Sequence, residues 1–105
     1  MNKRLAFLEQ TTRAGTADSF AWYALALEYR RESRVDDAVA TFEALKAKDP
    51  GYLPMYLMAG QTLLEAGKAE LAVGWLESGI ALAREKGDAK ALGELESALA
   101  EAREG

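Results

Sequence analysis

The sequence predicts an all-α fold, a solenoid of antiparallel helix pairs that ends in a C-terminal capping helix. Three observations predict it. Half of the 105 residues are apolar, alanine and leucine dominate, and there are only two prolines, a composition that favours helix. Apolar residues recur at helical spacing in successive segments. A pattern of large and small residues in the first half returns 34 residues later, a period typical of helical repeats.

The first two helices have clear boundary signals. Apolar spacing predicts a short helix over residues 3–13, and Gly15 follows it as a helix stop. Asp18 or Ser19 is then placed to cap the next helix, because either side chain can accept a hydrogen bond from an early backbone N–H. We expect this second helix over about residues 19–32.

A third helix is expected over about residues 35–48. Ser33 and Asp36 have the spacing of a capping box, with aspartate in place of the usual glutamate, and predict its start. Pro50 lacks an N–H and crowds the preceding turn, so the helix must end before it.

The next helix pair repeats the first. Large residues map onto large ones, apart from Leu25 and Leu45, and small residues map onto small ones. Where two helices of a pair cross closely only alanine or glycine fits, and the large residues fill the space beside the crossing. The equivalent pairs are Trp22 and Tyr56, Leu25 and Ala59, Ala26 and Gly60, Tyr29 and Leu63, Ser33 and Gly67, Ala38 and Ala72, Phe42 and Leu76, and Leu45 and Gly79.

The last segment is expected to cap the solenoid. Arg84 stands where a second proline would be expected, so the helix before this segment should run to about Lys86. Gly87 then provides a helix stop and Asp88 an N-cap. The helix that follows, about residues 89–103, has one apolar and one charged face, as a terminal helix of a solenoid requires.

The chain resembles a tetratricopeptide repeat (TPR) protein. The first match rests on Trp22, Leu25, Tyr29, Ala38, Phe42 and Pro50, and the second on Tyr56, Gly60, Leu63, Ala72 and Leu76. The resemblance implies a right-handed superhelical helix-turn-helix solenoid. We expect one TPR-like domain over residues 1–105, made of an N-terminal helix (3–13), repeat 1 (19–52), repeat 2 (53–86) and a capping helix (88–103).

The resemblance also implies a concave groove that binds a peptide or protein segment, and hence an adaptor or scaffold role. Family members that hold a C-terminal carboxylate use lysine, asparagine and arginine in the groove. Here the matching positions are largely apolar, so that specificity is not carried over. The expected groove residues are Phe20, Tyr23, Leu27, Arg30, Leu57, Gln61 and Leu64.

Composition argues against catalysis. The chain has no cysteine and no histidine, which excludes metal sites with those ligands and imidazole general bases. No phosphate-binding loop, acidic metal-binding loop or nucleophile elbow appears. We therefore expect no enzyme activity, no cofactor and no metal.

Charge and hydropathy limit the classes of partner and the cellular location that we expect for the chain. A net charge of −4 argues against nucleic acid, including a helix-turn-helix mode that would need a basic recognition helix. No apolar run is long enough for a membrane span or a signal peptide, and we expect a cytoplasmic protein. Arg30, Arg31 and Arg34 form one positive cluster, which is either a solvated helix end or a clamp for acidic groups.

One alternative function stays open. Two repeats with flanking helices leave apolar surface that a second copy could cover. The chain would then be a structural homo-oligomer, a homodimer that buries the groove and Trp75, an exposed or half-buried indole.

Overall fold

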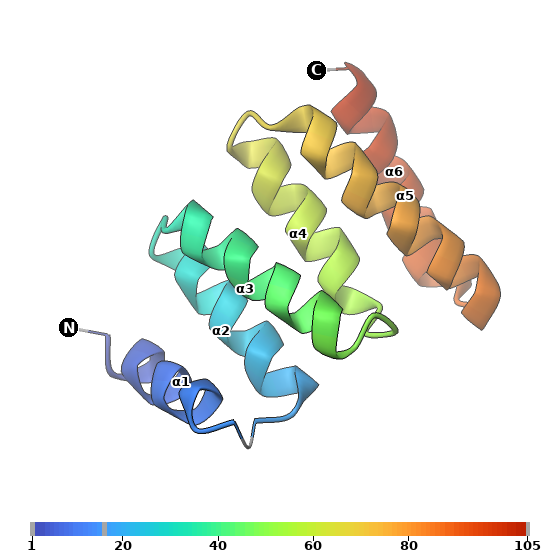
Figure 1. Ribbon diagram of the computed structural model, residues 1–105. Helices are drawn as coiled ribbons and strands as arrows, with labels where there is room; N and C mark the ends of the chain where they lie inside the picture. Colours follow the sequence, from blue (N-terminus) through green and yellow to red (C-terminus); the bar gives the residue numbers. More distant parts are fainter. Residues whose placement is uncertain (1, 16, 105) are drawn as a thin grey trace. The chain divides into compact units, whose positions relative to one another are not determined.

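The computed structural model describes residues 2–15 and 17–104, and within them the chain is helical with short loops (Figure 1). Six helices are present in the described part: α1 (Lys3–Arg13), α2 (Ser19–Arg31), α3 (Val35–Lys48), α4 (Pro54–Glu65), α5 (Ala69–Lys86) and α6 (Ala89–Glu104). The chain divides into two compact units, Met1–Pro50 and Gly51–Gly105. The expected helices are confirmed, including the extension of α5 to Lys86.

In the first unit α2 and α3 form a hairpin, and α1 packs against α2. Ala26 on α2 and Ala38 on α3 are both fully buried, as the predicted close crossing requires. A separate small core of Leu5, Leu8, Ala24 and Leu25, with Tyr29 packed against it, holds α1 in place.

Side chains fix the open end of the α2–α3 hairpin, where α2 begins and α3 ends. The Asp18 carboxylate accepts the Ala21 N–H at 2.9 Å, which confirms the predicted N-cap of α2. The Ser19 hydroxyl donates to the Asp49 carboxylate at 2.6 Å and so joins the start of α2 to the end of α3. The helix α3 ends at Lys48, before Pro50, as expected.

The predicted capping box at the start of α3 is wrong. Ser33 has a φ of 60°, and α3 begins after Arg34 with no side-chain cap. The turn is closed by the backbone instead, since the Arg34 N–H donates to the Tyr29 carbonyl at 2.9 Å. A left-handed residue after a helix forms this closure, and Ser33 occupies that position.

The turn between α4 and α5 has the same geometry 34 residues later. Gly67 has a φ of 78°, and the Lys68 N–H donates to the Leu63 carbonyl at 2.9 Å. The 34-residue repeat therefore includes backbone conformation as well as side-chain size. Ser33 adopts the left-handed conformation that Gly67 adopts in the second pair.

In the second unit α4 and α5 form a hairpin, and α6 packs on α5 and also on α4. Two glycines allow the close approach. A Cβ atom on Gly60 would lie 2.5 Å from Leu76, and one on Gly79 would lie 2.6 Å from the Tyr56 Cβ and 2.9 Å from Leu95. Gly79 is thus the place where α4, α5 and α6 meet.

Local signals also determine where α4 begins, where α5 ends and where α6 begins. Pro54 is the first residue of α4, where the absent N–H costs nothing. Gly87 ends α5 with a φ of 70°. The Asp88 carboxylate accepts the Ala91 N–H at 3.0 Å, which confirms the predicted cap of α6.

Candidate interaction surfaces

Four predicted groove residues share one face of α2. Phe20, Tyr23, Leu27 and Arg30 follow one another at helical spacing on this face. Phe20 is 64% exposed, and the other three are half-buried. The buried residues of the helix, among them Leu25, lie on other sides, so the structure brings these four together on a partly open face.

The other three predicted groove residues share one face of α4. Leu57, Gln61 and Leu64 are all half-buried. Gln61 and Leu64 also line a hollow of about 430 Å³, together with Glu65 and with Glu101 from α6. Sequence reasoning assigned α6 only a capping role and missed Glu101, because its place beside α4 depends on tertiary packing.

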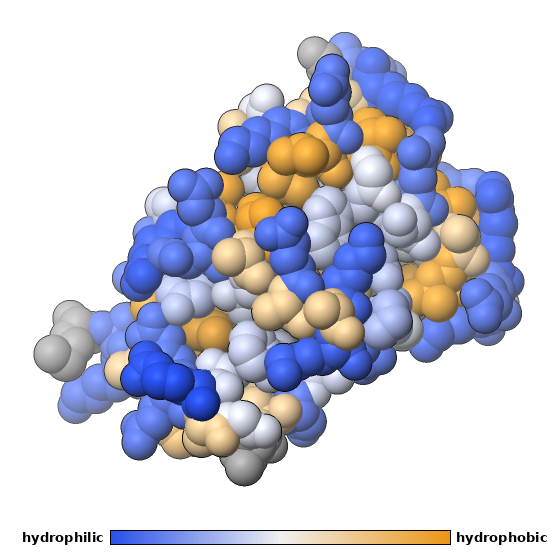
Figure 2. Space-filling model, in the orientation of Figure 1, coloured by the Kyte–Doolittle hydropathy of each residue, from blue (hydrophilic) through white to orange (hydrophobic). Residues whose placement is uncertain are grey.

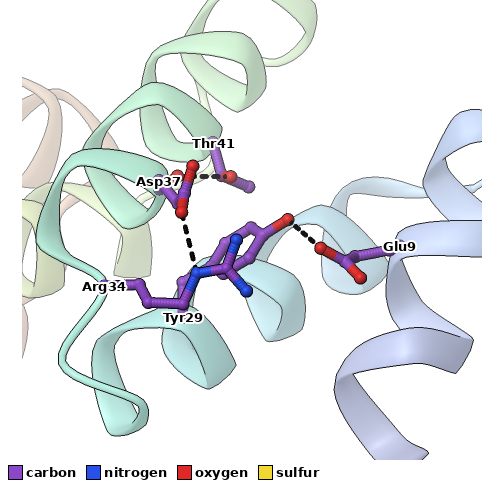
Figure 3. A network of polar contacts seen from close by, with 5 residues as sticks. All are labelled: Glu9, Tyr29, Arg34, Asp37 and Thr41. Atoms are coloured by element: carbon purple, nitrogen blue, oxygen red, sulfur yellow. Dashed lines mark hydrogen bonds and ion pairs between the residues drawn. The ribbon is translucent and has the colours of Figure 1, made fainter.

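A polar network surrounds Tyr29 and joins the three helices of the first unit (Figure 3). The Tyr29 hydroxyl donates to the Glu9 carboxylate, and the Arg34 guanidinium lies 4.7 Å from the centre of its ring. The Arg34 Nε donates to Asp37 at 2.8 Å, and the Thr41 hydroxyl donates to the Asp37 carbonyl. Burial, and then the hydrogen bond to Glu9, raise the pKa of Tyr29 to about 12.

Two arginines of the predicted cluster, Arg34 and Arg31, have different surroundings. The Arg34 side chain stacks on Tyr29 and pairs with Asp37, whose hydrogen bond raises the pKa of Arg34. Arg31 lines a separate hollow of about 800 Å³ at the α1–α2 contact. This hollow has charges of both signs, and its lining residues are Asn2, Lys3, Arg4, Glu28, Arg31 and Glu32.

Glu28 in that hollow is a structural group. It is only 6% exposed, and both of its described partners come from the start of α1. The Asn2 amide donates to one carboxylate oxygen at 2.9 Å, and the Arg4 Nε lies 3.3 Å from the other. A buried carboxylate with two partners stabilises the α1–α2 contact and leaves no unsatisfied group for a ligand.

Trp75 on α5 is half-buried. Its ring centre lies 5.9 Å from that of Tyr56 in a tilted arrangement, within the common range for aromatic pairs. One helical turn before it, Leu71 is 59% exposed. On the face drawn in Figure 2, orange and pale side chains lie over α4 and α5, with blue hydrophilic ones beside them.

The described residues hold no group of three or more aspartates, glutamates, cysteines or histidines that could bind a metal ion. Within the same ranges, no helix is long and apolar enough to cross a membrane.

Solved structures give the family. The solution structure of a tetratricopeptide repeat domain protein from Salinibacter ruber is 35% identical in sequence, with a TM-score of 0.75 over 81% of this chain and 86% of that one. A crystal structure of a Salinibacter ruber tetratricopeptide repeat domain protein also has 35% identity and a TM-score of 0.75, over 82% of this chain and 97% of that one. A protein from Bordetella parapertussis is 27% identical, with a TM-score of 0.83 over 99% of this chain and 90% of that one. Neither a protein-family model nor a curated protein matches the sequence.

The helix pairs, their 34-residue period and the partly open helix faces define a helical repeat protein of the kind that mediates protein interactions. The chain belongs to the tetratricopeptide repeat family, whose fold is a non-enzymatic interaction scaffold.

Proposed function

We propose that the chain is an adaptor or scaffold module that binds a peptide or protein segment in the expected concave groove. The proposed contacts lie on the α2 face of the first unit and, separately, on the α4 face of the second unit. The observation that carries the proposal is the α2 face, where Phe20 is 64% exposed beside half-buried Tyr23 and Leu27. Aromatic side chains that are partly exposed on a rigid helix lose little conformational entropy on binding and are frequent anchors of interfaces. The proposed binding residues are Phe20, Tyr23, Leu27 and Arg30 on α2, and Leu57, Gln61 and Leu64 on α4.

A random 12-residue peptide display library tests this function. The wild-type chain should enrich binders, and the triple variant Tyr23→Ala, Leu27→Ala, Leu57→Ala should lose them. The double variant Phe7→Ala, Leu71→Ala is the control, because it removes two exposed apolar side chains, 66% and 59% exposed, that lie outside the proposed site. Circular dichroism should show equal helix content in all three proteins. Equal peptide binding by the wild-type and triple-variant proteins would reject the groove.

Self-association is the second candidate. It is favoured by exposed Leu71 one turn before Trp75 on α5, since an apolar pair on an outer helix face can be covered by a second copy. Sedimentation velocity across concentrations tests it. The homodimer predicts a larger species that grows with concentration and disappears in Leu71→Glu. A single monomeric species at high concentration would eliminate this candidate.

A further inference from the structure

The hollow between α4 and α6 is lined by one apolar residue, Leu64, by Gln61, and by two acidic residues. Leu64 and Gln61, which line it from α4, are half-buried, whereas the side chains of Glu65 and Glu101 are exposed. Its volume of about 430 Å³ accommodates one long side chain. The hollow lies wholly within the second unit.

The second unit contains all of the net negative charge of the chain. Residues 1–50 carry eight basic and eight acidic side chains, whereas residues 51–105 carry five basic and nine acidic ones. Two of these basic side chains are held between α5 and α6, where Arg84 lies 3.4 Å from Glu96 and Arg103 lies 2.8 Å from Glu77. Glu101 makes no ion pair with any described residue.

The end of α4 adds to this negative potential. The carbonyl groups at the C-terminal end of a helix form its negative pole, which basic residues in the last turn usually offset. Among the six described helices α4 alone has no basic residue in its last turn. That turn contains Leu64 and Glu65, and so it borders the hollow.

We propose that this hollow receives a lysine or arginine side chain of the segment that binds along α4. Such a side chain has an apolar stem and a charged head, and it would place the stem on Leu64 and the head beside Glu101 and Glu65. The helix α6 is then a recognition element as well as a cap. The inference rests on the proposed function and specifies its partner as a segment with a basic residue.

Nuclear magnetic resonance titration tests the hollow directly. N-acetyl-arginine amide and N-acetyl-lysine amide are the probes, and N-acetyl-norleucine amide provides a similar apolar stem without the charge. We expect the two basic probes to shift the backbone amide signals of Gln61, Leu64 and Glu101, and added salt to weaken the effect.

Two variants separate the role of Glu101 from general charge. Glu101→Gln should weaken binding of the arginine probe about two- to fivefold, the range for an exposed ion pair. Glu85→Gln, which removes another exposed carboxylate from α5, should leave the binding of the arginine probe unchanged. Equal shifts with the norleucine probe, or an unaltered titration in Glu101→Gln, would overturn the inference.

Peptide selection distinguishes failure of the inference from failure of the proposed function. Peptides selected on the wild-type chain should be enriched in lysine and arginine, and Glu101→Lys should lose that enrichment. Peptides that depend on Tyr23 and Leu27 but show no basic preference would overturn the inference alone. An arginine probe that binds the hollow while no peptide binds the chain would overturn the proposed function and leave the basic preference of the hollow in place.

Discussion

The Tyr29 hydroxyl donates a 2.5 Å hydrogen bond to the carboxylate of Glu9, and this bond joins α2 to α1. The Arg34 guanidinium lies over the Tyr29 ring. Tyr29 was predicted as a packing residue of the repeat. It also forms one of the polar connections that hold the N-terminal helix.

The stability of the chain should fall in alkali through Tyr29. The pKa of Tyr29 is about 12 in the folded chain, above its ordinary value of 10.0, so an unfolded chain releases this proton first as the pH rises. The free energy of unfolding should therefore decrease as the pH rises from about 10 to about 12. Urea unfolding at several pH values measures the slope. In Tyr29→Phe the slope should be shallower, and identical slopes in the two proteins would contradict the assignment.

The stability of the contact between α1 and α2 should depend on Glu28. Glu28→Gln weakens the contact with Arg4 and should cost about 1 kcal/mol, the net value of a typical intramolecular hydrogen bond, because glutamine can still accept from Asn2. Hydrogen exchange should become faster in α1 and stay unchanged in α3. Glu43→Gln, on the exposed side of α3, is the matched control and should leave both helices unaffected.

Replacement of Ser33 by glycine should stabilise the folded chain. A left-handed conformation destabilises a residue with a side chain by about 1 kcal/mol. Ser33 adopts this conformation, with a φ of 60°. Ser33→Gly should raise the free energy of unfolding by about 0.5 kcal/mol, since the added freedom of the unfolded chain offsets part of the gain. The reverse change, Gly67→Ser, should destabilise the chain. Thermal melts of both variants check the pair, and a loss of stability in Ser33→Gly would refute this account of the turn.

Two glycines of α5 should respond oppositely to alanine. Gly79→Ala places a methyl group 2.6 Å from the Tyr56 Cβ and should destabilise the chain by about 1–3 kcal/mol. Gly74→Ala meets nothing within 4 Å and should stabilise it by about 0.5–1 kcal/mol through helix propensity. Urea unfolding of the two variants measures the difference, and effects of the same sign would count against this packing.

The alanines at the close crossings should not tolerate bulk. Ala38 and Ala72 are fully buried, and leucine at either position should cost about 1–3 kcal/mol by forcing the paired helices apart. Ala40→Leu, at an exposed position of α3, should change stability by less than about 0.5 kcal/mol. If thermal melts give all three variants the midpoint of the wild-type chain, the predicted crossing is wrong.

Local chemistry made much of the fold predictable. Asp18 and Asp88 bond to N–H groups three residues ahead, so the sequence around each suffices to identify it as a cap. The repeat was visible because packing imposes the same residue sizes at the same spacing. The capping box predicted from Ser33 is absent, since that pattern is local whereas the turn is closed by backbone hydrogen bonds to the preceding helix.

Tertiary contacts explain what the sequence could not provide. Glu28 resembles any surface glutamate until α1 packs against it, and Glu101 resembles a solvated residue until α6 lies beside α4. The faces of α2 and α4 were predictable from helical spacing. Their use as a peptide site remains a prediction, because binding depends on a partner that helical spacing does not specify.

The absence of a side chain at Gly79 has a further consequence, for the order in which the chain unfolds. Tyr56 of α4 and Leu95 of α6 both occupy the space beside this residue of α5, so none of the three helices can leave without uncovering the other two. The N-terminal helix, in contrast, packs only on α2 among the described helices. Unfolding should therefore start by fraying at the N-terminal end of the chain, whereas the C-terminal three helices come apart together, as one cooperative block.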